Sequence, residues 1–212
     1  MKQGAGISIP ADGGPLQGSM ALPRAATGIV AFAHGSGSSR FSPRNVYVAR
    51  ALQQAGVGTL LFDLLTREED HVYQTRFDIG LLTERLLAAS RWLKENPDTA
   101  AMKLGYFGAS TGAAAALQAA AEPDAGVAAV VSRGGRPDLA GNMALGKVQC
   151  PTLLIVGGLD DVVIGLNRQA HARLQCPKEL VIVPGASHLF EEPGTLERVA
   201  ELAAAWFVKH LA

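Results

Sequence analysis

Cysteine, charge and long apolar runs are all scarce in this sequence of 212 residues. The two cysteines, Cys150 and Cys176, are too few for a disulfide framework or a cysteine-rich zinc site, so we expect buried thiols in a reducing compartment. No apolar run approaches the roughly 18 residues that span a bilayer, and the first 14 residues lack the apolar core of a secretory signal. Only 18% of the residues are charged, which argues against disorder. We therefore expect a soluble, cytoplasmic, globular protein without a membrane segment.

A surplus of charge of either sign is missing as well, because 19 basic and 19 acidic residues cancel. Without a basic run or a basic patch that contains aromatic residues, the sequence lacks the electrostatic signature of a nucleic-acid-binding protein. No group of histidine, cysteine, aspartate and glutamate residues has the spacing of metal ligands, so we predict neither a metal nor another cofactor. The sequence has instead 48% hydrophobic residues and 24 glycines, which suits one domain over residues 1–212 with many tight turns.

Short apolar runs that are typical of strands alternate along the chain with longer segments of helical periodicity. The predicted strands are residues 7–10, 16–22, 28–33, 59–62, 103–107, 127–132, 152–156 and 180–183. The predicted helices are residues 46–55, 79–93, 110–121, 163–174 and 196–211. Residues 63–76 and 133–151 lack a clear helical pattern, so we interpret both as irregular and expect no sizeable cap domain. The alternation predicts an α/β fold, with a mostly parallel open sheet of about eight strands, helices on both faces and an antiparallel pair at its start.

In an open α/β sheet, reactive groups collect where the carboxyl ends of strands meet the next helix. The segment Gly-Ala-Ser-Thr-Gly at residues 108–112 lies between a predicted strand and a predicted helix and fits the G-x-S-x-G pattern of a nucleophile elbow. Its glycines let strand and helix approach closely, the sharp turn exposes the Ser110 hydroxyl, and the helix amino terminus favours negative charge. The alternative is a glycine-rich turn without chemistry. Because both flanking elements are present, we favour Ser110 as a nucleophile.

A serine nucleophile needs a base to accept its proton and an acid to orient that base. In elbow enzymes the acid and then the histidine follow the serine, and here Asp160 and His188 each follow a predicted strand. The alternative for Asp160 or Asp161 is that it only caps the next helix, and Asp161 is the better placed of the two for that role. The alternative for His188 is an ordinary loop histidine. The remaining histidines fit the role of the base less well, because they precede the serine or lie within helices: His34, His71, His171 and His210.

Two backbone amides are needed to stabilise the oxyanion of the transition state. Thr111, directly after the nucleophile, is expected to supply one of them. The loop after the strand at residues 28–33 is rich in glycine, and we expect the Ser36 amide, in preference to that of Gly37, to supply the other. The alternative role of this loop is a phosphate cradle, but neither the P-loop pattern nor the G-x-G-x-x-G spacing is present.

Five segments of the sequence together resemble a known family. They read HGSGSSR, GYFGASTGAAAAL, SRGGRPDL, LLIVGGLDDVV and PGASHLFEEPGTL. In combination they resemble the α/β-hydrolase fold, and more narrowly its small dienelactone-hydrolase-like members, which occur alone or fused to a phosphoribosyltransferase domain. The resemblance implies a serine esterase with a Ser110–His188–Asp160 triad and oxyanion amides at Ser36 and Thr111. Dienelactone hydrolases proper carry a cysteine at the elbow, so the serine argues against dienelactone itself as the substrate.

Four arginines follow strands that should end beside this site: Arg40, Arg44, Arg133 and Arg136. Their guanidinium groups can clamp a carboxylate or phosphate of a substrate, with Arg133 the best candidate to face the pocket. The favoured alternative is that they only brace the loops, through salt bridges with Asp63, Glu68, Glu69 or Asp138. The expected substrate contacts are His34, Gly35, Gly37, Arg40, Arg133 and Phe190, and Phe41 and Met143 are further candidates for apolar walls.

This constellation predicts a serine hydrolase that cleaves a small-molecule carboxylic ester through an acyl-enzyme. A thioesterase, a lactonase or an acyltransferase would use the same residues. Outside the enzymes, the alternatives are a non-catalytic binding module or an interaction domain for a separate phosphoribosyltransferase. A missing cap leaves the site open, so we expect short acyl chains to be hydrolysed better than long ones. The sequence leaves the oligomeric state open.

Overall fold

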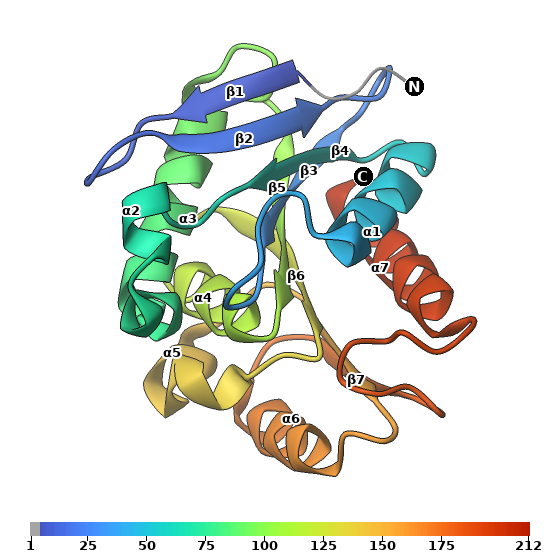
Figure 1. Cartoon of the computed structure of the whole chain (residues 1–212). Helices are drawn as coiled ribbons and strands as arrows, with labels where there is room; N and C mark the ends of the chain where they lie inside the picture. The colour runs from blue at the N-terminus through green and yellow to red at the C-terminus, as the bar shows by residue number, and fades with distance from the viewer. Residues whose placement is uncertain (1–4) are drawn as a thin grey trace.

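One sheet of eight strands forms the centre of the computed structural model, which describes residues 5–212 (Figure 1). Its strand order is β1-β2-β4-β3-β5-β6-β7-β8. β2 pairs antiparallel with both β1 and β4, and every other neighbouring pair is parallel. The strands are β1 (Ala5–Ile9), β2 (Leu16–Ala21), β3 (Gly28–Ala33), β4 (Gly58–Phe62), β5 (Lys103–Ala109), β6 (Val127–Arg133), β7 (Thr152–Gly157) and β8 (Lys178–Val183).

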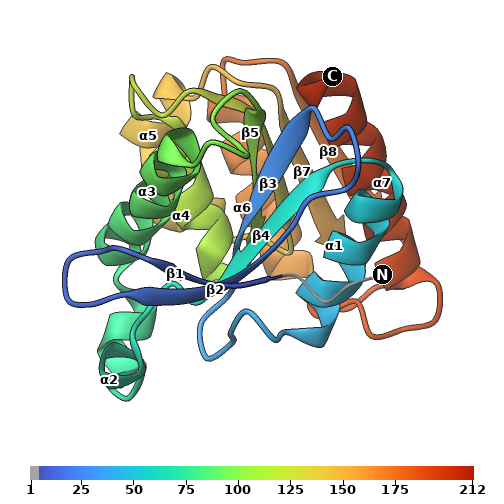
Figure 2. The same cartoon turned by 90° about the horizontal axis from the view of Figure 1, so that it is seen from above.

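Helices cover both faces of this sheet. In Figure 2, α3, α4 and α5 lie on one side, and α1 and α7 lie on the other. The helices are α1 (Pro43–Gln54), α2 (Arg67–Asp70), α3 (Ile79–Glu95), α4 (Thr111–Ala120), α5 (Asn142–Lys147), α6 (Asp161–Arg173) and α7 (Thr195–Leu211), with the short 3₁₀ helices η1 (Tyr73–Phe77) and η2 (Pro137–Ala140).

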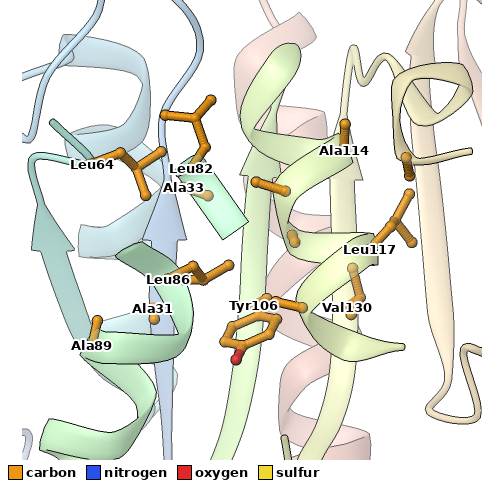
Figure 3. Close-up of a cluster of buried hydrophobic side chains, with 14 of the residues drawn as sticks. Ala31, Ala33, Leu64, Leu82, Leu86, Ala89, Tyr106, Ala114, Leu117 and Val130 are labelled. Carbon is orange, nitrogen blue, oxygen red and sulfur yellow. The ribbon is translucent and has the colours of Figure 1, made fainter. Parts of the chain in front are cut away.

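The central strands are buried because helices enclose the sheet from both sides. Every residue of β3, β4 and β7 is buried, as expected for parallel strands with continuous apolar sequences. On the side of α3 and α4, Leu86 and Leu117 pack with Tyr106 and Val130 (Figure 3). The Tyr106 hydroxyl lies 2.6 Å from the Ser90 hydroxyl, so the one polar atom of this aromatic side chain has a partner inside the core.

The opposite face, under α1 and α7, has a second core. The rings of Phe32 and Phe107, from the neighbouring strands β3 and β5, have centroids 4.9 Å apart and belong to the same cluster as Phe207 of α7. Val131 of β6 also belongs to this cluster. Because side chains alternate along a strand, Arg133 projects toward the same face, at the end of β6.

The structure confirms the predicted sheet, its antiparallel start and its helices on both faces. It also extends the predicted helix at residues 46–55, because α1 begins at Pro43, with the Ser42 hydroxyl accepting the Asn45 amide at 3.4 Å. A proline is well suited to this first helical position, since it has no amide hydrogen to leave unpaired.

The interpretation of residues 63–76 and 133–151 as irregular was wrong in part. The first segment contains α2 and η1, and the second contains η2 and α5. α2 has a capping box, in which the Thr66 hydroxyl accepts the Glu69 amide and the Glu69 carboxylate accepts the Thr66 amide. These helices are four to six residues long, so they are too short to show a helical period in the sequence. Within residues 5–212 none of these segments forms a cap domain.

All strands from β3 onward run in parallel, so their carboxyl ends meet at one edge of the sheet. The loops that follow β3 and β8 lie along this edge, at the bottom of Figure 2. Segments that are far apart in the sequence thereby come together where the predicted site residues are found.

Candidate active site

Ser110 stands alone in a sharp turn between the last residue of β5 and the first residue of α4. Its backbone has φ 51° and ψ −119°, a conformation that L-residues rarely adopt and that costs on the order of 1–3 kcal/mol. The end of β6 holds this turn from the side, because the Ser110 amide donates to the Arg133 carbonyl at 3.3 Å and the Arg136 amide donates to the Ser110 carbonyl at 3.1 Å. This is the strained elbow that the sequence predicted at residues 108–112.

Two glycines permit the elbow for a steric reason. A Cβ atom at Gly112 would lie 2.2 Å from the Ala33 carbonyl oxygen and 2.5 Å from that of His34. A Cβ atom at Gly108 would lie 2.4 Å from the Ala113 Cα. Strand β3, strand β5 and helix α4 therefore approach each other as closely as they do only because both positions lack a side chain.

Asp160 and His188 come together at the same edge of the sheet. His188, in the loop after β8, has its Nδ1 atom 2.6 Å from the Asp160 Oδ2 atom. Asp160 precedes α6 without capping it through its side chain, so the carboxylate remains available for the histidine. Its side chain is 16% exposed and that of His188 is 38% exposed, so the ring reaches solvent while the carboxylate is mostly enclosed. Asp161 is exposed in the first turn of α6.

The elbow and the histidine adjoin the same short segment after β6. The Arg133 carbonyl accepts the Ser110 amide, and a Cβ atom at the next residue, Gly134, would lie 3.6 Å from the His188 Cε1 atom. Among the described residues, no hydrogen bond joins Ser110 to His188. In unliganded enzymes this bond is often long and shortens when substrate is bound.

The loop after β3 reaches the amino terminus of α4. A Cβ atom at Gly35 would lie 3.2 Å from the Ser110 Cβ, and Gly37 has φ 67°. The Ser36 amide donates to the Thr111 hydroxyl at 2.9 Å, while the Thr111 amide, as the first of the helix, has no partner within it. Both predicted oxyanion donors thus lie beside Ser110. The Ser36 amide would have to exchange or share its present acceptor, the Thr111 hydroxyl, in order to bind an oxyanion.

Both ring nitrogens of His34, one of the expected substrate contacts, are used within the protein. Nε2 accepts the Leu64 amide at 3.0 Å, so Nδ1 carries the hydrogen and donates to the Gly35 carbonyl at 2.9 Å. The ring is buried, and burial lowers its pKa, which keeps it neutral. His34 instead ties the loop after β3 to the loop after β4.

Two of the four arginines brace loops through ion pairs, which is the favoured alternative given above. Arg40 forms an ion pair with Asp63, whose carboxylate also accepts the Arg40 amide at 2.7 Å. Arg136 donates to both oxygens of Asp138, at 2.9 and 2.7 Å, and the hydrogen bond to Asp138 raises the pKa of Arg136. Arg40, one of the expected substrate contacts, thus has a carboxylate partner within the protein.

Arg44 and Arg133 differ from that pattern. Arg44 pairs at 2.9 Å with Glu191, which was not among the predicted acidic partners. Arg133 is 6% exposed and pairs with no carboxylate among the described residues. The pKa of Arg133 is lowered to about 10, mainly by burial and also by the charge of the nearby Arg44.

The predicted apolar walls are placed differently. Phe190 is 1% exposed and belongs to the core under α1 and α7, so it does not offer its ring to a substrate as predicted. The φ of 56° at Phe190 is a strained backbone conformation, which accompanies the burial of its ring in this core. Met143 is exposed beside a separate cavity of about 380 Å³, and none of the three predicted triad residues lines that cavity. Phe41 is exposed next to Arg40, whose guanidinium carbon lies 4.3 Å from its ring centroid.

Two residues of the site were not identified from the sequence. Glu192 accepts the Ser187 amide at 3.0 Å and so fixes the backbone next to His188. Arg76 of η1 reaches the loop after β3, where its Nη1 atom lies 3.7 Å from a Cβ atom placed on Gly37. Neither contact leaves a local signal, because each depends on how a loop folds back.

Two further observations bear on ligands and location. Among residues 5–212 no group of three or more histidine, cysteine, aspartate and glutamate side chains is placed to hold a metal ion. In the same part of the chain, none of the helices combines the length and the apolar character needed to cross a membrane.

A mostly parallel sheet with a serine elbow after β5, and an aspartate and a histidine after β7 and β8, defines an α/β-hydrolase. Distant solved structures share the fold. A lidless α/β serine hydrolase from Xanthomonas campestris has a TM-score of 0.76 at 23% identity, over 100% of this chain and 96% of its own. Est1E from Butyrivibrio proteoclasticus has a TM-score of 0.82 at 17% identity, over 97% of this chain and 98% of its own.

The chain belongs to the dienelactone hydrolase family, whose model matches residues 16–209. It is similar to the solved dienelactone hydrolase from Anabaena variabilis, with 58% identity, a TM-score of 0.96 and coverage of 100% of this chain and 99% of that one. It is also 58% identical over 205 residues to two Mycobacterium tuberculosis proteins, from strains CDC 1551 and H37Rv, which are provisionally named phosphoribosyl transferases. That match covers 97% of this chain and 46% of each relative, so the chain spans about half their length. Family and fold together support a hydrolase.

Proposed function

We propose that this chain hydrolyses small carboxylic esters with Ser110 as the nucleophile, His188 as the base and Asp160 as the acid that orients it. The contact of 2.6 Å between His188 Nδ1 and Asp160 Oδ2 carries the proposal. A carboxylate at Nδ1 places the hydrogen on that nitrogen, so Nε2 is left unprotonated and able to accept a proton. The strained turn at Ser110 supplies the other half of the argument, because it projects the hydroxyl at the same edge of the sheet.

The reaction has two halves. In the first, His188 Nε2 takes the Ser110 proton as Oγ attacks the ester carbonyl, and the bond to the alcohol breaks as His188 returns the proton to the leaving oxygen. In the second, His188 deprotonates a water that attacks the acyl-enzyme, which releases the acid and restores the serine. The Thr111 and Ser36 amides hold the oxyanion in both halves, and Asp160 stabilises the imidazolium that forms each time.

The open site favours small acyl groups. Leu159 and Leu189, the neighbours of Asp160 and His188, are both exposed and offer an apolar rim to a short chain. No cap domain encloses a long chain within residues 5–212. Thioesters and lactones present the same carbonyl chemistry, and an acyltransferase would replace water by another alcohol, so these remain the alternatives on the same residues.

A burst assay with 4-nitrophenyl acetate, butyrate and octanoate tests the proposal. We expect nitrophenol release in a burst equal to the enzyme concentration, decreasing in rate from the short esters to the octanoate. Mass spectrometry of the quenched protein should find the acyl group on the peptide that contains Ser110.

The variant Ser110→Ala should lose both the burst and the label, while Ser8→Ala, at an exposed position of β1, should keep them. If neither the parent nor Ser110→Ala releases nitrophenol, and ligands nevertheless raise the melting temperature, the binding-module hypothesis takes the place of this one.

We also propose that the chain works beside a phosphoribosyltransferase. The relatives from Mycobacterium tuberculosis support this, since their provisional name describes such an activity and they are about twice as long as the matched region. Sedimentation of this chain mixed with the unmatched half of such a relative tests for association. One species with the summed mass supports the proposal, and two independent species contradict association between separate chains.

A further inference from the structure

Arg133 is a buried cation without a carboxylate partner among residues 5–212. Its residue is 6% exposed, and its Nε atom is enclosed without a hydrogen-bond partner. Although burial lowers its pKa to about 10, the side chain is still protonated at neutral pH. A guanidinium in this position has lost much of its hydration, and no oxygen of a described side chain replaces the lost water.

The surroundings of Arg133 contain more positive than negative charge. Arg44 of α1 is close enough to disfavour the charge on Arg133. Arg44 pairs at 2.9 Å with Glu191. Among the described residues, Glu191 is the only carboxylate that forms an ion pair with either of these two guanidinium groups. The three side chains therefore carry a net charge of +1, and one further anion would balance it.

The ring of Phe190 does not account for this arrangement. Its centroid lies 5.9 Å from the Arg133 guanidinium carbon, at the outer limit of a cation–π contact. Such a contact is weak compared with the desolvation of a buried charge, so it leaves most of that cost without compensation.

Arg133 is also next to the reacting groups. It pairs across the sheet with Ala109, the residue before Ser110, and adjacent strands lie about 4.8 Å apart. Its carbonyl accepts the Ser110 amide, and the following residue, Gly134, adjoins the His188 ring. The backbone of Arg133 therefore adjoins both Ser110 and the His188 ring, so this side chain starts beside the place where the ester carbonyl of a substrate would lie.

We propose that Arg133, with Arg44 beside it, binds a carboxylate or phosphate group of the substrate. The proposal rests on the function proposed above and narrows its substrates to small anionic esters. Carboxylates and phosphates share the property that matters, which is two or more oxygens that a guanidinium fork can bind together.

Matched esters test this subsite. The neutral ester is methyl 3-acetoxybenzoate, and the anionic ones are 3-acetoxybenzoate and 3-acetoxyphenyl phosphate. In the parent protein we expect a higher kcat/KM for an anionic ester than for the neutral one, and the preferred anion identifies the group. In Arg133→Met the ratio of anionic to neutral kcat/KM should fall at least tenfold, mainly through KM, and Arg133→Lys should recover part of it.

The control for net charge is Arg91→Met, an exposed arginine of α3 on the opposite face of the sheet, which should keep the parent ratio. If Arg133→Met and Arg133→Lys both keep the parent ratio as well, the subsite does not exist, whatever the level of ester hydrolysis.

A binding measurement separates this proposal from the proposed function. In a cationic buffer with chloride only, benzoate or inorganic phosphate should raise the melting temperature of the parent and of Ser110→Ala, and of Arg133→Met much less. If these shifts in melting temperature are found but no ester is hydrolysed, the anion subsite is supported and the proposed hydrolase function is contradicted. Without added anion, Arg133→Met should melt no lower than the parent, because it replaces an unpaired buried charge by an apolar chain of similar size. A lower melting temperature with an unchanged ester ratio would make Arg133 a structural brace and overturn the proposal.

Discussion

The Nδ1 atom of His188 lies 2.6 Å from the Oδ2 atom of Asp160, although the two residues follow different strands and are 28 positions apart. The parallel arrangement of β7 and β8 explains this contact, because it brings the loops after both strands to one edge. Asp161, one position further, is exposed on α6 and takes no part in it.

Asp160→Asn should reduce kcat for 4-nitrophenyl butyrate by about a thousandfold or more, with a much smaller effect on KM. An amide in place of the carboxylate no longer favours hydrogen on Nδ1, so the ring loses the tautomer that accepts the serine proton. The control, Asp161→Asn, should stay within about twofold of the parent. Equal losses in the two variants would contradict the assignment of Asp160 as the acid.

Gly112→Ala should destabilise the protein by more than about 3 kcal/mol or prevent folding, because its Cβ would meet the carbonyl oxygens of Ala33 and His34 at 2.2 and 2.5 Å. Gly165→Ala is the matched control, since it lies within α6 with open space around its Cβ position, and it should stabilise by about 0.5–1 kcal/mol. Urea unfolding of both variants measures the difference. A Gly112→Ala variant as stable as the parent would mean that β3 and α4 are less closely packed.

Thr111→Val should lower kcat about tenfold, because the Ser36 amide loses the hydroxyl that holds the loop after β3 against α4. Thr111→Ser retains the hydroxyl and should stay close to the parent, and both variants keep the backbone amide of residue 111. Steady-state kinetics with 4-nitrophenyl acetate decide the point. If valine raised kcat instead, the bond between Ser36 and Thr111 would be a competitor of the oxyanion.

The stability of the protein should fall as the pH drops below 6.5, in part because of His34. Burial lowers the pKa of His34 in the folded state, so the unfolded chain binds its proton at a higher pH than the folded chain does. The contribution of neutral His34 to the free energy of unfolding is complete above the ordinary pKa of 6.5 and is lost as the pH falls below that value. For one proton, the free energy of unfolding then changes by at most about 1.4 kcal/mol per pH unit.

Urea unfolding at pH 7.5 and pH 5.5 measures this effect of His34. His34→Gln keeps an acceptor for the Leu64 amide but does not titrate, so it should lose less stability between the two pH values than the parent. His71→Gln, at an exposed position after α2, should behave like the parent. An unchanged pH dependence in His34→Gln would show that folding does not lower the pKa of this histidine.

Much of the fold could be predicted from the sequence because its signals are local. The continuous apolar run of β3 and the helical periodicity of α3 each appear within a short window of residues. α2 and α5 were missed, since a helix of four or six residues shows no period. The start of α1 was placed too late, because a proline at the first helical position does not look helical by periodicity.

The candidate site, like the fold, could be predicted from the sequence only in part. Ser110, Asp160 and His188 could be proposed from their order and from their positions directly after strands. The substrate contacts expected of His34, Arg40 and Phe190 could not be judged, because each depends on a partner or a burial set by another part of the chain. His34 meets a backbone amide 30 positions away, and Arg40 meets a carboxylate 23 positions away.

The amino-acid sequence by itself determined the alternation of strands and helices, and with it the edge of the sheet where reactive side chains collect. The tertiary structure alone decided which of the four arginines near the site have a carboxylate partner and that Arg133 has none among the described residues. The physical reason is that secondary structure follows from the chain's local pattern of apolar residues and glycines, whereas an ion pair or a buried charge follows from how loops pack after the sheet has formed. Arg40 and Arg133 have the same side chain. Arg40 braces a loop because Asp63 lies beside it, whereas no carboxylate of the described residues pairs with the buried Arg133.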